Sequence, residues 1–219
     1  MPHLIRHVLI LSVLAVTAVT APAQTASRAV SVVLKQYGSA YGQRLVAVTG
    51  LNGSPQPAEW HVFAYDLKTS GTISHWVLAG GKITAAAMLD AQRSRQWAAP
   101  VLPWDRVKID SDAAFKIADA TARQAAVGFD NLGYRLMTDR RSGAAVWLLE
   151  LADSRGKIVG SLRIDAVHGT VLSQVWGKGG FGADRFDWKV VKQEMNKIGR
   201  NIGSSWQRFK QDVRNTFGR

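Results

Sequence analysis

Three histidines, His61, His75 and His168, have the side-chain type that could bind a metal ion or act as a general base. They are far apart in the sequence, and none belongs to a compact motif such as H-E-x-x-H, which is typical of zinc hydrolases. A reactive site would require all three to meet in space beside a carboxylate or a serine. This requirement defines one alternative for the chain, a secreted hydrolase.

Other reactive groups are missing from the sequence. The 219 residues contain no cysteine, which excludes disulfides, cysteine-ligated metals and thiol catalysis within this chain. The sequence has no G-x-S-x-G nucleophile elbow and no G-x-x-x-x-G-K-[ST] phosphate-binding loop. We therefore expect a protein that is not an enzyme and that has no catalytic residue, cofactor or metal ion.

Aromatic residues are concentrated in two β-rich runs, Trp60–Asp66 and Thr72–Leu78. Three of them, Trp60, Phe63 and Trp76, would form a face for binding a peptide or a glycan if they were exposed together. Aromatic residues on neighbouring strands more often pack in the core or against each other. Both interpretations are open from the sequence.

A hairpin turn is predicted between Asp165 and Gly169. An aspartate at the start of a turn can accept hydrogen bonds from backbone N–H groups further along, and a glycine at its end can take a positive φ. These two residues are therefore expected to have a structural role.

Elements of the same kind recur in the same order along the chain. Apolar residues at helical spacing predict a helix over Gln24–Tyr41, and a second helix over Ala113–Val127 follows the capping sequence Asp110-Ser111-Asp112. Several short β-rich runs separated by turn residues follow each helix. We predict an α+β fold of two tandem helix-plus-antiparallel-sheet units, which are residues 24–87 and 109–176 joined by a linker at 88–108.

The first 23 residues have the pattern of a secretory signal peptide. Arg6 and His7 precede an uncharged run from Val8 to Thr20, and the small residues of Ala21-Pro22-Ala23 follow it. Cleavage is predicted before Gln24, with an uncleaved N-terminal anchor as the alternative. The chain is therefore expected to be extracytoplasmic, either in the periplasm or secreted.

The sequence changes character at a glycine-rich linker, residues 177–186, and continues as a predicted long amphipathic basic helix, residues 187–219. One side of this helix carries apolar residues at helical spacing, namely Trp188, Val191, Met195, Ile198, Ile202, Trp206 and Phe209. The other sides carry basic residues that include Lys189, Lys192, Lys197 and Arg200. Such a helix can dock on the preceding sheet, pair with another copy, or lie on an anionic membrane surface.

The whole chain is strongly basic, with a formal net charge of +12. This charge favours an anionic partner or surface. A nucleic acid is not the partner we expect, because the chain is predicted to be exported and no nucleic-acid motif accompanies the charge.

The second predicted unit resembles the PepSY domain family over Ile109–Leu172. The matching segments are IDSDAAFKIAD (Ile109–Asp119) and a strand, turn and strand over Ala144–Leu172, which include the closing motif IDAVHGTV (Ile164–Val171). The first unit resembles the family only in outline, because Ala79-Gly80-Gly81 stands where an Asp-containing turn is expected. The resemblance implies an α+β fold in an extracytoplasmic binding or regulatory module, a class with no established catalytic residues and with proposed roles in peptidase inhibition.

Taken together, these patterns predict an exported, non-enzymatic, PepSY-like binding or regulatory protein. Its partner would be a polypeptide or another component of the cell envelope, recognised through a sheet edge or an aromatic face. The main alternative is a peripheral membrane-surface scaffold attached through the basic C-terminal segment. The sequence does not indicate the oligomeric state.

Overall fold

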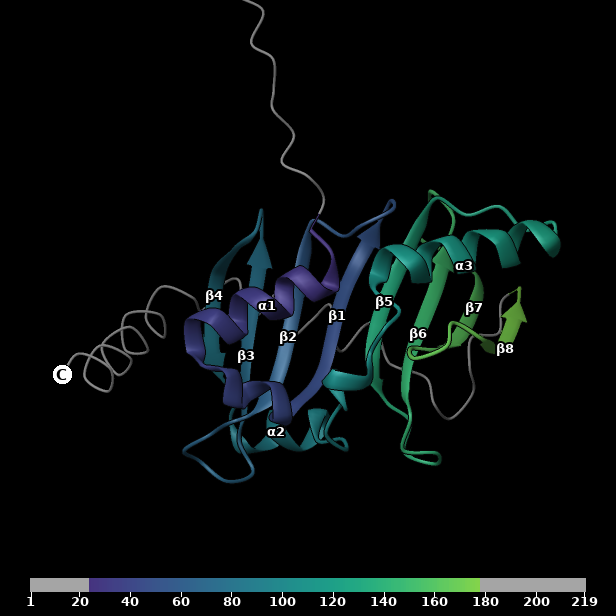
Figure 1. Ribbon diagram of the computed structural model, residues 1–219. Coiled ribbons are helices and arrows are strands. Elements are labelled where there is room, and N and C mark those ends of the chain that lie inside the picture. Colours follow the sequence, from purple (N-terminus) through teal and green to yellow (C-terminus); the bar gives the residue numbers. More distant parts are fainter. Residues whose placement is uncertain (1–23, 178–219) are drawn as a thin grey trace, which may run out of the picture.

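Eight β-strands form a single antiparallel sheet in the computed structural model, which describes residues 24–177 (Figure 1). The strand order across the sheet is β4-β3-β2-β1-β5-β6-β7-β8. The strands are β1 (Leu45–Gly53), β2 (Glu59–Tyr65), β3 (Ile73–Ala79), β4 (Lys82–Met88), β5 (Asn131–Thr138), β6 (Ala145–Ala152), β7 (Ile158–Asp165) and β8 (Val171–Trp176).

Two helices cover the same face of this sheet, which we call the helix face (Figure 1). Helix α1 (Ala26–Tyr37) lies over the half that contains β1–β4, and helix α3 (Ser111–Gln124) lies over the half that contains β5–β8. The opposite face, which we call the reverse face, packs against the short helix α2 (Ala91–Trp97) around Phe63 and Trp97. Two short 3-10 helices, η1 (Ser39–Arg44) and η2 (Trp104–Arg106), complete the described elements.

Local sequence signals account for both long helices. Thr25 caps α1 by accepting a hydrogen bond from the N–H of Arg28, and Gly38, at φ 109°, ends the helix in a conformation that favours glycine. Asp110 caps α3 through its carboxylate. Small and β-branched residues such as Ala29 and Val30 face the sheet, so that each helix can lie close to the strands.

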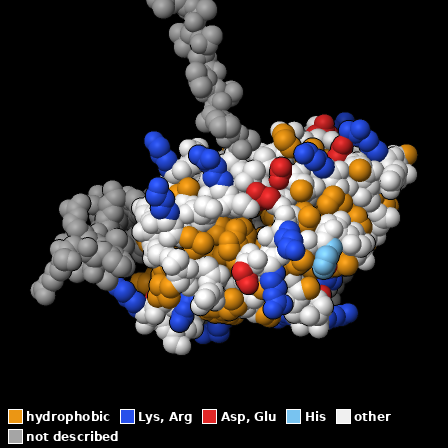
Figure 2. Space-filling view, in the orientation of Figure 1, with side chains coloured by type: hydrophobic (Ala, Val, Ile, Leu, Met, Phe, Trp, Pro, Cys, Tyr) orange, Lys and Arg blue, Asp and Glu red, His pale blue; other side chains and the backbone are white. Residues whose placement is uncertain are grey.

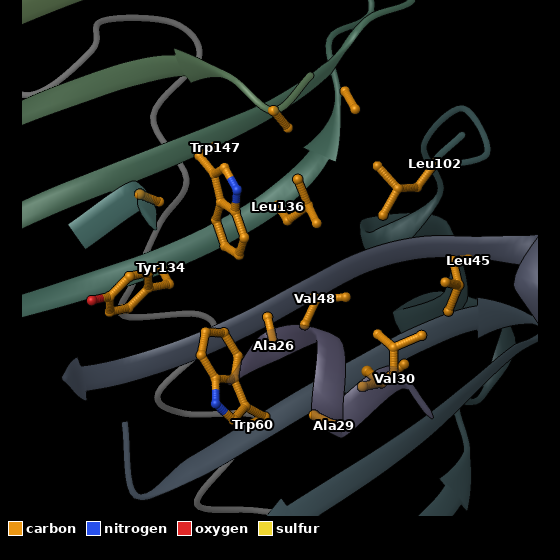
Figure 3. Close-up of a cluster of buried hydrophobic side chains, with 14 of the residues drawn as sticks. Ala26, Ala29, Val30, Leu45, Val48, Trp60, Leu102, Tyr134, Leu136 and Trp147 are labelled. Carbon is orange, nitrogen blue, oxygen red and sulfur yellow. The ribbon is translucent and has the colours of Figure 1, made fainter. Parts of the chain in front are cut away.

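One hydrophobic core runs along the helix face across both halves of the sheet. At its centre, the rings of Trp60, Tyr134 and Trp147 contact one another from β2, β5 and β6 (Figure 3). Their centroids lie 5.6 Å apart for Trp60–Tyr134, 6.5 Å for Trp60–Trp147 and 6.1 Å for Tyr134–Trp147. This aromatic cluster lies where the two halves of the chain meet.

The prediction of two tandem helix-plus-sheet units is therefore wrong. Strand β1 pairs directly with β5, as in the register Val48↔Leu136, so that the strands form one continuous sheet. The physical reason is that two separate sheets would leave β1 and β5 as open edges, whose backbone N–H and C=O groups would have no partners. The predicted linker is also part of the structure, since it carries α2 and η2 and buries Leu89, Trp97 and Leu102.

The remaining terminal predictions concern residues that the structure does not describe. The signal peptide at 1–23, the linker beyond Gly177 and the predicted helix at 187–219 all lie outside the described residues. No long C-terminal helix is therefore part of the described fold. Within residues 24–177, no helix is long and apolar enough to span a membrane.

Candidate functional site

The turn between β7 and β8 is held by the side chain of Asp165. Its Oδ1 accepts hydrogen bonds from the N–H groups of Val167 at 2.7 Å and His168 at 3.0 Å. Gly169 takes φ 75°, and its N–H donates to the carbonyl of Asp165 at 2.9 Å. Burial raises the pKa of Asp165, but the hydrogen bonds from Val167 and His168 outweigh it and leave the pKa below its ordinary value. The turn sets where β8 begins.

Strand β8 is an edge of the sheet, and within residues 24–177 it pairs only with β7. The Gly177 N–H donates to the carbonyl of Val159 at 2.9 Å, which shows that the backbone groups of Gly177 point toward β7. Because this direction alternates along an antiparallel strand, the N–H and C=O groups of Gln174 and Trp176 point away from the sheet. The outer edge of β8 therefore presents backbone groups to a potential partner strand.

The composition of β8 lacks two of the features that commonly protect the edge of a sheet. Its sequence, VLSQVW, contains no charged residue and no proline, whereas the other edge strand, β4, carries the exposed Lys82. Charged side chains and prolines are common means by which edge strands avoid pairing with other chains. Leu172 is 50% exposed at the start of β8, next to an irregularity in the β7–β8 register.

Trp176 lies flat against the sheet at the end of β8. A Cβ atom added to Gly160, its partner on β7, would be 2.5 Å from Cε3 of the indole, so the ring occupies the space that a side chain would fill. Gly160 therefore permits the position of Trp176. Gln174 and Trp176 lie on the same face of β8, and they are also the residues whose backbone groups point to its outer side.

A second cluster, on the reverse face, contains two of the three histidines. His61 on β2 and His75 on β3 are 2% and 1% exposed, and Nδ1 of His61 lies 2.9 Å from Nε2 of His75. The His75 ring stacks on Phe63, and Phe63 stacks on Trp97 with centroids 4.3 Å and 3.8 Å apart. The guanidinium of Arg135 lies 5.4 Å from the Trp97 ring, which completes a stacked column.

Both buried histidines are held in the neutral state. Burial lowers the pKa of His61 to about 4, and burial together with the neighbouring His61 lowers the pKa of His75 well below its ordinary value. In either tautomer of the pair, one ring donates to the other. The outer atoms, Nε2 of His61 and Nδ1 of His75, are buried without a hydrogen-bond partner in the described part of the chain. A substrate therefore has no access to these rings.

The structure does not bring the three histidines together. His168 has a side chain that is 72% exposed and lies in the β7–β8 turn beside Asp165, whereas His61 and His75 are on β2 and β3 in the other half of the sheet. Among the described residues, no group of three histidine, cysteine, aspartate or glutamate side chains could hold a metal ion. The geometry required for the hydrolase alternative is therefore missing from residues 24–177.

Of the two interpretations of Trp60, Phe63 and Trp76, the structure agrees with packing in the interior and contradicts an exposed binding face. Trp60, Phe63 and Trp76 are 0%, 2% and 1% exposed. Trp60 and Trp76 pack in the core of the helix face, and Phe63 packs on the reverse face against Trp97. The reason is the strand period of two, which puts residues three apart, such as Trp60 and Phe63, on opposite faces.

The candidate residues of the C-terminal segment lie outside the described residues. These are Trp188, Lys189, Val191, Lys192, Met195, Lys197, Ile198, Arg200, Ile202, Trp206 and Phe209. On the part of the helix face that Figure 2 shows, lysine and arginine side chains are spread widely and do not form a single patch.

Two features of the site were missed from the sequence. Gln174 and Trp176 were not singled out, although the absence of charge and proline in the last strand was a usable signal. Gln24 was predicted as the residue after the cleavage point and as the start of the first helix, but its contact with Trp60 was not predicted. In the structure it is 6% exposed, and its carbonyl accepts a hydrogen bond from Nε1 of Trp60 at 2.6 Å.

Comparisons of the chain with protein-family models, with curated proteins and with solved structures find no match.

Proposed function

We propose that this chain is an exported, non-enzymatic binding protein that recognises an extended segment of an envelope polypeptide by adding it as a strand to β8. The observation that carries the proposal is the outer edge of β8, where Gln174 and Trp176 direct backbone groups away from the sheet. Binding by strand addition uses such groups for affinity and the alternating side chains for specificity.

The side chains around this edge indicate the kind of segment that would fit. A partner strand would place every second side chain on the helix face, on the same side as Gln174 and the indole of Trp176. Apolar residues at alternate positions would bury this surface, and the uncharged β8 would not repel either sign of charge. Each added backbone hydrogen bond contributes about 1 kcal/mol net, so the affinity depends on these side-chain contacts as well.

The proposed export and the PepSY-like character rest on sequence patterns. The signal-like residues 1–23 support an extracytoplasmic location, and the motif over Ile164–Val171 supports a relationship to PepSY-like binding modules. In the structure this motif forms the end of β7, the Asp165–Gly169 turn and the start of β8. The part of the chain that resembles the family is thus the part that positions the proposed binding edge.

The experiment uses two substitutions at one position. Gln174→Pro removes the outward N–H and leaves the N–H groups that pair with β7, because proline is tolerated on an edge strand when its nitrogen faces solvent. Gln174→Ala is the matched control, since it removes the side chain and keeps the N–H. A peptide selected from a displayed library of extended sequences against the full chain serves as the probe.

We expect the selected peptide to bind the wild type and Gln174→Ala with similar affinity, and Gln174→Pro at least tenfold more weakly. Hydrogen exchange should slow at the N–H groups of Gln174 and Trp176 when the peptide is bound. Equal binding by Gln174→Pro, or exchange that stays unchanged at both residues, would refute the proposed site. Slower exchange that depends on protein concentration without peptide would show that a second copy occupies the edge instead.

A second candidate function is attachment to an anionic membrane surface through residues 187–219. It is favoured by the charge of residues 178–219, which contain ten basic and four acidic residues. Co-sedimentation with vesicles of anionic lipid should fall strongly when the chain ends at Gly177. If the shortened chain sediments as well as the full chain, the basic segment is not the anchor.

A further inference from the structure

Gln24 is held at the edge of the core by its oxygen atoms. Its backbone carbonyl accepts a hydrogen bond from Nε1 of Trp60 at 2.6 Å, and its side-chain Oε1 accepts one from the N–H of Gly81 at 3.0 Å. Its side-chain nitrogen, Nε2, is buried and has no hydrogen-bond partner in the described part of the chain. Only 6% of the residue is exposed. The amide oxygen thus has a role in this structure, and the amide nitrogen has none.

We propose that Gln24 is a modification site, at which the exported chain cyclises to an N-terminal pyroglutamate. The inference rests on the proposed export, because cleavage before Gln24 is what makes this residue the N-terminus. In the reaction, the new α-amino nitrogen attacks Cδ of the Gln24 side chain and forms the lactam N–Cδ bond. The Cδ–Nε2 bond breaks, and Nε2 leaves as ammonia with a proton from the attacking amine. No oxidant, reductant or second substrate is needed.

The atom that leaves is the one that lacks a partner. Loss of Nε2 removes a buried donor that has no acceptor, and such a donor is costly to keep in a folded protein. The side-chain oxygen, which accepts from the N–H of Gly81 in the open form, is retained as the carbonyl oxygen of the lactam. The backbone carbonyl that accepts from Trp60 takes no part in the reaction.

The charge at this position also favours the cyclic form. Cleavage would create an α-ammonium group immediately before α1, whose N-terminus already carries the positive end of the helix dipole. The N–H groups of Ala26 and Ser27 in the first turn are satisfied by Oγ of Ser111 and by Oδ1 of Asp110. A lactam nitrogen is uncharged, so cyclisation removes a positive charge from a place where the helix already disfavours one.

The hydrogen bonds of Gln24 in the folded chain indicate when cyclisation occurs relative to cleavage and docking. In the folded chain, Oε1 of Gln24 is bound to the N–H of Gly81, so the side chain is not free to rearrange. Cyclisation therefore follows cleavage and precedes the docking of Gln24 against Trp60. The cyclised N-terminus has no free amino group and is therefore resistant to aminopeptidases.

The experiment starts from the full chain, exported by a host cell and purified without a tag at the N-terminus. We expect the N-terminal peptide, measured by tandem mass spectrometry, to begin at residue 24 and to be lighter by the mass of one ammonia molecule. The control is Gln24→Asn, which keeps a side-chain amide but could cyclise only to a strained four-membered ring. This variant should keep its full mass and a free amino group.

The N-terminal residue and its mass distinguish a failure of the proposed modification from a failure of the proposed cleavage. A chain that begins at residue 24 with an open glutamine would overturn the modification and leave export intact. A chain that keeps residues 1–23, or begins elsewhere, would overturn the cleavage on which the inference rests.

A second measurement tests the structural argument. The open form is released from a fusion protein by a protease that leaves Gln24 first, and its unfolding in urea is compared with that of the cyclised form. We expect the midpoint of the cyclised form to lie at the higher urea concentration. A higher midpoint for the open form would show that the site does not favour the lactam.

Discussion

The carboxylate of Asp110 accepts a hydrogen bond from the backbone N–H of Ser27, at 3.0 Å, although the two residues belong to opposite halves of the chain. The same oxygen accepts from the N–H of Ser111 at 2.7 Å, so one side chain serves the N-termini of α1 and α3. Ser111 adds to this connection, because its Oγ accepts from the N–H of Ala26 at 3.1 Å and donates to Oε1 of Gln56 at 2.7 Å. The two helices on the helix face are thus joined at their N-termini.

This shared cap leads to the first prediction. Asp110→Ala should lower the free energy of unfolding by about 2 kcal/mol, because both helices lose an acceptor for a first-turn N–H. The control is Asp112→Ala, which removes an exposed carboxylate from the first turn of α3 and should cost about 0.5 kcal/mol through the helix dipole. Urea denaturation measures both values. If the two variants lose equal stability, Asp110 contributes only through its charge.

Local features of this fold were predictable because they depend on neighbouring residues. The capping sequence at Asp110, the β-rich runs and the Asp165–Gly169 turn were all visible as short patterns. The pairing of β1 with β5 was not, because the choice of partner depends on contacts between residues distant in the sequence, such as Trp60 with Trp147. A recurring order of elements is compatible both with two separate sheets and with one shared sheet.

The candidate site was predictable only in part for the same reason. The sequence suggested a sheet edge as the means of recognition, but which strands become edges depends on the whole strand order. The sequence left the burial of the aromatic residues open, because Trp60 and Phe63 lie on opposite faces of the sheet and their burial depends on what covers each face. The contact between His61 and His75 depends on the β2–β3 register, in which Phe63 lies opposite His75.

A second prediction concerns the surface beside the proposed binding edge. Gly160→Ala should displace the indole of Trp176, because the added Cβ would lie 2.5 Å from Cε3 of the ring. Overpacking of this kind typically costs about 1–3 kcal/mol, and the displaced indole should also weaken binding of the peptide selected for β8.

The control for this prediction is Gly128→Ala, since a Cβ at Gly128 would meet no atom within 4 Å. Thermal unfolding measures the stability of each variant, and tryptophan fluorescence reports the environment of the indoles. A Gly160→Ala variant with wild-type stability and unchanged peptide binding would show that the ring moves aside at no cost and does not contribute to the edge.

A third prediction follows from the hydroxyl group of Tyr134, which donates to the backbone carbonyl of Pro55 in the β1–β2 connection. Tyr134→Phe keeps the ring in the aromatic cluster and removes only this hydrogen bond. The expected loss of stability is about 1–2 kcal/mol, because the carbonyl of Pro55 loses its partner. The control is Tyr65→Phe, whose hydroxyl donates to the carbonyl of Ala99 at 2.9 Å on the reverse face. Hydrogen exchange in Gly53–Glu59 should increase only in Tyr134→Phe; an equal increase in the control would contradict a local role.

The last prediction is a loss of stability in mild acid that originates in the buried histidine pair. The pKa of His61 is about 4 in the folded chain and 6.5 in the unfolded chain, so protons bind the unfolded state preferentially between these values. Stability is therefore complete above about pH 6.5 and falls as the pH decreases toward 4. With about 1.4 kcal/mol per pKa unit, His61 alone accounts for about 3 kcal/mol. His75 acts in the same direction, because burial and the charge of His61 also lower its pKa.

The pH range in which stability is lost distinguishes the contribution of the histidines from that of the carboxylates. The pKa values of Asp66 and Asp165 lie below the ordinary 3.8 in the folded chain, so their contributions are lost only in more acidic solution. The double variant His61→Leu and His75→Leu should have a nearly flat stability profile between pH 6.5 and 4, whereas the exposed His168→Ala should behave as the wild type. Urea midpoints measured across this range provide the comparison. If the double variant keeps the full acid sensitivity of the wild type, the buried imidazoles are not its source.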